Sequence, residues 1–295
     1  MAYGSGDFQY ELVEGWGDLP DGYEWHQVAG VAVDSNDNVY AFNRSSHQMM
    51  VFDSDGAFLN TWDQTFEGPH GIHIGPDNCV YLADRDAHVV SKYSLDGELL
   101  LRLGTGRPSE TGYTSNSEPV PKAAGPFNLP TSIAVTEEGE IFISDGYGNS
   151  RVHRYNSTGS LVLSWGLPGK VNPGDFHLPH GIGLDHDGYV LVCDRENDRL
   201  QVFDQEGEFE EIFTGFRQPT DVHVGPDGEI YVPELQGRMT IIDNGGNILA
   251  QWGGDRTHEA GLFWAPHGVA VDSRGDIYIG EVLEGQRLQK FARLR

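Results

Sequence analysis

One phrase returns six times along the chain and limits the folds that the chain can adopt. Each copy opens on a short start such as Pro-His-Gly or Pro-Thr, followed by a run of alternating apolar residues, a turn of the general type Asp-x-x-Gly/Asn and a second alternating run. The copies lie at 28–43, 68–84, 129–145, 178–194, 218–234 and 265–281. They begin about 40–60 residues apart, which is the spacing of propeller blades with one larger insertion.

Each copy predicts two strands joined by a hairpin, because apolar residues alternate on either side of an Asp/Gly turn. A third strand follows every copy, and a fourth follows five of them, at 58–62, 99–103, 161–165, 209–213 and 248–252. The sixth copy reaches Arg295 without a fourth strand, and a segment with the same apolar-to-Trp ending stands at 10–16. We therefore expect an all-β, six-bladed β-propeller as a single domain over 1–295. The N-terminal strand would complete the last blade, since closure of this kind removes the long open sheet edge.

The segment 104–127 interrupts the repeat between the second and third blades. It is rich in Gly, Pro, Ser and Thr, so it predicts a long loop. Loops of this length are usually functional or disordered. Two interpretations stay open at this stage, a lid over one face of the propeller or a flexible excursion.

Composition excludes several classes of partner. The chain has 45 Asp and Glu against 19 Lys and Arg, for a net charge of −26, so binding to nucleic acid or to an anionic membrane is not expected. No apolar run approaches the roughly 20 residues of a membrane span, and the N-terminus lacks the basic and apolar regions of a signal peptide. Cys79 and Cys193 fit buried free thiols in a reducing compartment. We expect a cytoplasmic monomer.

Histidine follows the blade-start proline in alternate copies. The innermost strand of a blade lines the propeller channel, so residues aligned on these strands form a ring about its axis. That ring reads Ala29, His70, Thr131, His180, Thr220 and His267. Three imidazoles related by about 120° would converge with an axial position open, which is the ligand count of a catalytic zinc site. The alternative is that Pro-His-Gly is only a structural motif at the start of a blade. The metal site is favoured over this alternative because the ring contains no Lys or Arg and its histidines occupy alternate blades.

A second aligned position, at the end of the second strand, carries Asn43 in the first blade and an acidic residue in the other five. In three blades an arginine follows this position: Arg44, Arg85 and Arg195. We expect the acids to accept hydrogen bonds from neighbouring backbone N–H groups. Arg44 and Arg195 are candidates to bind a carboxylate or oxyanion, whereas Arg85 is better interpreted as half of a structural Arg–Asp pair between blades. Tyr147 lies between two glycines in the third blade. It is a candidate general base, because nearby positive charge stabilises a phenolate.

The segments SDGYGNSR (144–151) and CDRENDR (193–199) carry a resemblance to a known enzyme family. They are similar to motifs of peptidyl-α-hydroxyglycine α-amidating lyase, a six-bladed propeller of NHL-type repeats, and the likeness is strongest over 125–205. The resemblance implies a carbon–nitrogen lyase that splits the carbinolamide R-CO-NH-CH(OH)-COO⁻ into an amide and glyoxylate. It implies one Zn²⁺ held by His70, His180 and His267.

In the same resemblance Tyr147 is the base, and Arg44 and Arg195 orient the substrate, a small molecule or the C terminus of a peptide. Three positions depart from the family pattern. Gly148 replaces a cysteine that the family joins in a disulfide. Ala265 and Gly268 fall where the family has a methionine and a calcium-ligating aspartate, which argues against a structural Ca²⁺.

Two other functions remain open from the sequence. One is a metal-dependent propeller hydrolase or lactonase acting on another small molecule. The other is a non-catalytic NHL scaffold that binds proteins, which would need neither the alternating histidines nor Tyr147 between glycines. Release of glyoxylate separates the lyase from the hydrolase, and bound metal separates both enzymes from the scaffold.

Overall fold

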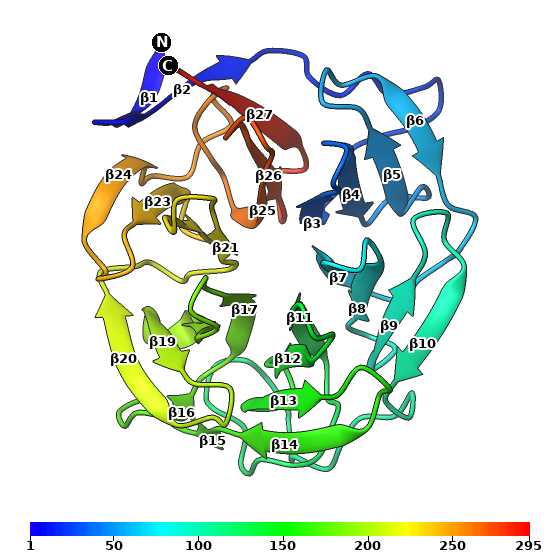
Figure 1. Ribbon diagram of the computed structural model, residues 1–295, viewed down its shortest axis with the longest axis vertical. Helices are drawn as coiled ribbons and strands as arrows, with labels where there is room; N and C mark the ends of the chain where they lie inside the picture. The colour runs from blue at the N-terminus through cyan, green and yellow to red at the C-terminus, as the bar shows by residue number, and fades with distance from the viewer. The chain divides into compact units, whose positions relative to one another are not determined.

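The structure, a computed structural model that describes all 295 residues, is an all-β, six-bladed β-propeller (Figure 1). Six sheets carry the six predicted repeats, and within each sheet consecutive strands pair antiparallel. The only helical element is a single 3₁₀ turn, η1 (Arg195–Asn197), and no helix has the length and apolar character needed to cross a membrane. The fold class predicted from the repeat is confirmed.

The chain divides into two compact units, one made of Phe66–Val222 and the other of Met1–Thr65 with His223–Arg295. The single-domain boundary at 1–295 stays a prediction, and each unit is described in turn.

The unit 66–222 contains three blades in chain order (Figure 1). They are β7 (Pro69–Ile74), β8 (Val80–Asp84), β9 (Val89–Tyr93) and β10 (Leu99–Leu103); β11 (Pro130–Val135), β12 (Ile141–Asp145), β13 (Arg151–Tyr155) and β14 (Leu161–Trp165); and β17 (Pro179–Leu184), β18 (Val190–Asp194), β19 (Arg199–Phe203) and β20 (Phe209–Thr214). A short parallel pair that the repeat did not predict, β15 (Leu167–Pro168) and β16 (Asp175–Phe176), precedes β17. No strand interrupts 104–127, which confirms the predicted long loop.

The other unit contains the remaining blades. They are β3 (Val28–Val33), β4 (Val39–Asn43), β5 (Met49–Phe52) and β6 (Phe58–Thr61); β21 (His223–Val224), β22 (Ile230–Glu234), β23 (Arg238–Ile242) and β24 (Ile248–Gly253); and β25 (Pro266–Val271), β26 (Ile277–Glu281) and β27 (Leu288–Arg293) completed by β2 (Phe8–Val13). β21 is shorter than the repeat predicts.

Closure by the N-terminal strand is seen in the pairing of β2 with β27, with Leu12 opposite Phe291. The strand begins and ends earlier than the expected 10–16. An additional strand that the repeat did not indicate, β1 (Ala2–Ser5), pairs outside β2 and makes this sheet five-stranded. β2 thereby covers the edge of β27, and β1 becomes the outermost strand of this sheet.

Apolar residues from facing blades make the core. Between the third and fourth blades, for example, Phe142, Trp165 and Phe203 pack together in one buried cluster. The Asp-x-x-Gly turns are held by the aspartate itself: Asp185 Oδ1 accepts the N–H groups of Asp187 and Tyr189 at 3.0 and 2.8 Å. Asp34 and Asp272 hold their turns in the same way. This side-chain mimicry of a backbone turn explains why an aspartate opens several of the hairpins.

As predicted, the aligned acidic residues at the ends of the second strands bind backbone amides in four blades. Asp84 accepts the Gly68 N–H at 2.7 Å, Asp145 the Asn128 N–H at 2.9 Å and Asp194 the His177 N–H at 2.8 Å. Glu281 does the same with the Trp264 N–H at 2.6 Å. Each buried carboxylate therefore fixes the segment that enters the inner strand of its own blade, and with it the residue that starts that strand.

Candidate metal and catalytic site

His70, His180 and His267 each stand second in an inner strand, in β7, β17 and β25. The pairing register of all three strands shifts directly around the histidine, and such bulges re-aim a side chain. The glycine that follows is dictated by close packing. A Cβ at Gly71 would lie 2.4 Å from Thr131 O, and one at Gly181 would lie 2.5 Å from Asp221 Cα. The Pro-His-Gly sequence therefore suits an inner strand that bends at the histidine and packs closely at the glycine.

The Nδ1 atom of each histidine binds a backbone carbonyl of the next residue in the predicted ring. His70 Nδ1 donates to Thr131 O at 2.7 Å, His180 Nδ1 to Thr220 O at 2.5 Å and His267 Nδ1 to Ala29 O at 2.6 Å. A carbonyl can only accept, so Nδ1 carries the proton and Nε2 of a neutral ring keeps its lone pair. The backbone carbonyls of the odd blades therefore set the tautomer of the neighbouring imidazoles.

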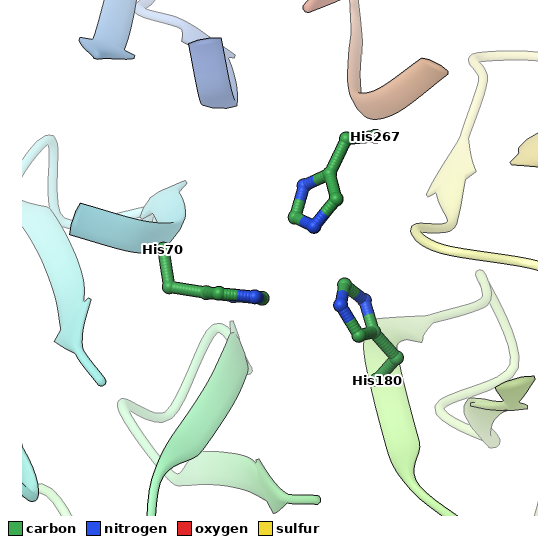
Figure 2. Close-up of side chains that lie close together, drawn as sticks. All are labelled: His70, His180 and His267. Atoms are coloured by element: carbon green, nitrogen blue, oxygen red, sulfur yellow. The ribbon is translucent and has the colours of Figure 1, made fainter. Parts of the chain in front are cut away.

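The three imidazoles form a group in which one ring nitrogen from each lies within 4.8 Å of the others (Figure 2). The side chains are almost fully buried, at 1%, 1% and 4% residual exposure for His70, His180 and His267. Three imidazoles with Nδ1 held by a backbone carbonyl are the donor set and outer support of a catalytic zinc site. The residues present therefore fit a divalent transition metal such as zinc.

Tyr147 lies in the turn that follows β12, and its hydroxyl reaches two of these rings. The Oη atom is 3.3 Å from His70 Nε2 and 3.3 Å from His180 Nε2. Both flanking glycines are required by close approach: a Cβ at Gly146 would lie 1.8 Å from Pro179 O, and one at Gly148 would lie 2.2 Å from Asn128 Oδ1. The turn is thus pressed against the start of β17, which brings the phenol to the histidines.

Arg195, in η1, lies against the same phenol. Its Nη1 donates to Tyr147 Oη at 3.3 Å, and its guanidinium carbon is 5.3 Å from the centre of the tyrosine ring. The Arg195 side chain is largely buried and its Nε and Nη2 atoms bind Glu196 at 2.9 and 2.8 Å. Tyr147 Oη therefore lies beside a cation and beside two of the ring nitrogens that would hold the metal. That arrangement suits a group that takes up and gives back a proton.

Arg85 has a second contact that sequence reasoning did not find. As expected it forms an Arg–Asp pair, but within its own blade, through Nε and Nη2 to Asp86 at 2.8 and 2.9 Å. Its guanidinium carbon also lies 5.3 Å from the centre of the Tyr147 ring. The signal was available in the shared alignment of Arg85 and Arg195 at the strand ends.

Arg44 belongs to the other unit, directly after β4. Its backbone N–H donates to Gln27 O at 2.9 Å and its Nη1 to Gln27 Oε1 at 2.8 Å. These two bonds fix Arg44 to the segment that enters β3. Its role toward a substrate stays a prediction.

Comparison with known proteins places the chain in a family. The NHL repeat model matches residues 127–155, 176–203 and 263–291. Over 306 residues the chain is 32% identical to human NHL repeat-containing protein 3, covering 97% of this chain and 84% of that protein. The chain belongs to the NHL repeat family.

Relatives with enzyme names match less closely. The chain is 28% identical over 278 residues to peptidyl-alpha-hydroxyglycine alpha-amidating lyase 1 of Drosophila melanogaster, covering 84% of this chain and 49% of the lyase. It thus matches about half the length of that relative. Among solved structures, a gluconolactonase from Xanthomonas campestris superposes with a TM-score of 0.67 at 14% identity, over 97% of this chain and 90% of the other. That likeness shows the fold alone, and the NHL propellers related to this chain include proteins named as lyases.

Proposed function

We propose that this NHL propeller is a zinc-dependent carbon–nitrogen lyase that splits a carbinolamide-like substrate into an amide and glyoxylate. The observation that carries the proposal is the position of Tyr147 Oη, 3.3 Å from each of His70 Nε2, His180 Nε2 and Arg195 Nη1. A scaffold that only binds proteins has no need of a partly buried phenol held between two imidazoles and a guanidinium. Similarity to named amidating lyases supports the same reaction class.

The metal ligands in this proposal are His70, His180 and His267, and zinc bound there would act as a Lewis acid toward the substrate α-hydroxyl. Tyr147 Oη accepts the hydroxyl proton. As the hydroxyl carbon becomes a carbonyl, its bond to nitrogen breaks and the departing nitrogen takes up a proton, so the proton lost at oxygen is balanced at nitrogen. The products are a primary amide and glyoxylate.

The arginines supply positive charge for the negative parts of this substrate. Arg195 donates to Tyr147 Oη, so it stabilises the phenolate form that accepts the proton. The charge of Arg85 is balanced by Asp86, and its guanidinium lies over the ring of Tyr147. Arg44 and Arg195 are the proposed partners of the substrate carboxylate. Because Nε and Nη2 of Arg195 already bind Glu196, Arg195 would act on the carboxylate through its positive charge.

The test is glyoxylate release from α-hydroxyhippurate, an N-acyl α-hydroxyglycine, by the zinc-loaded protein, with gluconolactone hydrolysis assayed in parallel. We expect Tyr147→Phe to retain the metal and to lose about 10²–10⁴-fold in kcat, the usual contribution of a positioned acid–base group. His180→Ala should lose both metal and turnover. Unchanged turnover in Tyr147→Phe would remove the base assignment, and lactone hydrolysis without glyoxylate release would replace the lyase by a hydrolase.

A further inference from the structure

The insertion 104–127 is hydrogen-bonded to the turn that carries Tyr147. Thr111 is fully buried at 0% exposure although its neighbours in the loop are polar and mostly exposed. Its hydroxyl donates to the carbonyl of Gly148, the residue after Tyr147, at 2.6 Å. A short bond between a buried hydroxyl and a buried carbonyl is a specific contact, since loss of either partner leaves the other unsatisfied.

Asn128 completes this contact from the other side of the turn. Its Nδ2 donates to Thr111 Oγ1 at 3.0 Å and to Ser109 O at 3.0 Å, while its backbone carbonyl accepts the Gly148 N–H at 2.9 Å. The hydroxyl of Thr111 therefore both donates and accepts, and both polar groups of the Gly148 backbone are bound. Valine has the shape of threonine but can make neither hydrogen bond.

The next residue of the turn is held by the same insertion. Asn149 is buried, its Oδ1 accepts the Ala124 N–H at 3.2 Å and its Nδ2 donates to Ala124 O at 3.2 Å. The two residues after Tyr147 are thus both hydrogen-bonded to the insertion or its flanking residue Asn128.

The middle of the insertion continues beside the site. Tyr113 Oη donates to Asn116 Oδ1 at 2.9 Å, and the Asn116 carbonyl accepts from His177 Nε2 at 3.0 Å. Burial raises the pKa of Tyr113, and the Arg85 charge opposes that shift. The loop therefore runs from the Tyr147 turn to the segment before β17, and of the two interpretations left open by the sequence a flexible excursion does not fit these contacts.

We propose that Thr111 is a positioning residue for Tyr147, and that the insertion thereby forms part of the candidate site. The kinetic part of this inference rests on the proposed lyase function. Tyr147 Oη must meet three nitrogens at 3.3 Å, and a displacement of about 1 Å in a reacting group can lower a rate by about 100-fold. Thr111 acts only through the Gly148 backbone and does not contact the substrate.

The decisive variants are Thr111→Val, which removes the hydroxyl at constant shape, and Thr111→Ser, which keeps it. Thr114→Val, at an exposed position of the same loop, is the matched control. Glyoxylate release, bound metal and amide hydrogen exchange over 144–151 are measured for each. We expect Thr111→Val to lower kcat at least tenfold with KM within twofold, to keep the metal and to speed exchange at the Gly148 amide at least tenfold. Thr111→Ser should restore most of kcat, and Thr114→Val should match the parent.

Equal kcat in Thr111→Val and the parent, or a Thr111→Ser variant no better than Thr111→Val, would overturn the inference. If Thr111→Val does not fold, Thr111→Ala takes its place as the variant without a hydroxyl. If the parent protein releases no glyoxylate, the proposed function has failed. Hydrogen exchange then tests by itself whether Thr111 holds the Tyr147 turn. Faster exchange of the Gly148 amide in Thr111→Val would support this role, and an unchanged exchange rate would overturn it.

Discussion

His73, in β7, makes the stability of the protein sensitive to acid. Burial lowers the pKa of its imidazole from 6.5 to about 4, and the nearby Asp77 carboxylate only partly opposes this shift. The buried Nε2 atom has no hydrogen-bond partner to stabilise a proton. The folded protein therefore holds His73 neutral over a pH range in which the unfolded chain protonates it.

The sign and size of the effect follow from these two pKa values. Because the folded pKa lies below the unfolded one, the stabilisation is complete above pH 6.5 and is lost as the pH falls toward 4. Between pH 8 and pH 5 the unfolded imidazole gains most of a proton that the folded one does not. With 1.36 kcal/mol for each pKa unit, the free energy of unfolding should fall by about 2 kcal/mol from His73 alone.

Urea unfolding at pH 8 and pH 5 measures this contribution by difference. The His73→Gln variant cannot titrate, so its loss of unfolding free energy over this range should be smaller than that of the parent by about 2 kcal/mol. His186→Gln, in an exposed turn, is the control and should behave as the parent does. Identical losses in His73→Gln and the parent would refute the assignment of a buried neutral imidazole.

Two further substitutions test the packing and the charges beside the site. Gly148→Ala places a Cβ 2.2 Å from Asn128 Oδ1, so we expect it to lower the free energy of unfolding by about 1–3 kcal/mol, whereas Gly125→Ala meets no atom within 4 Å and should change it little. Arg199→Ala removes the partner that binds Asp194 through Nε at 2.7 Å and leaves a buried carboxylate, at a cost of about 3–5 kcal/mol at pH 8 in urea unfolding. Burial already raises the pKa of Asp194 to about 6, so the loss should shrink as the pH falls below 6; a loss equal at pH 8 and pH 5 would contradict this explanation.

The repeat could be predicted because its signals are local. Alternating apolar residues on either side of turns rich in Asp and Gly specify each hairpin, and the unmatched strand near the N-terminus specifies how the last blade is completed. Position within the repeat also predicted the His70–His180–His267 group, since aligned residues of a propeller face a common axis.

Contacts between segments far apart in sequence could not be predicted. Thr111 has no neighbour in sequence that explains its burial, and its partner Gly148 lies 37 positions away. Arg85 shares an alignment position with Arg195, but its approach to Tyr147 depends on how two blades pack. The carbonyls of Thr131 and Thr220 that fix the histidine tautomers belong to the backbone, and backbone direction has no signature in residue type.

Metal content is the most direct test of the account. The protein is stripped with chelator, reloaded with Zn²⁺, dialysed extensively and analysed for metal per chain, together with His70→Ala, His180→Ala, His267→Ala and the control His186→Ala. We predict about one zinc per chain in the parent and in the control, and a loss of at least tenfold in each of the three ligand variants, because a three-histidine site does not hold zinc tightly with two. A parent chain that retains no zinc, or ligand variants that retain it as the parent does, would contradict the proposed metal site and the lyase chemistry built on it.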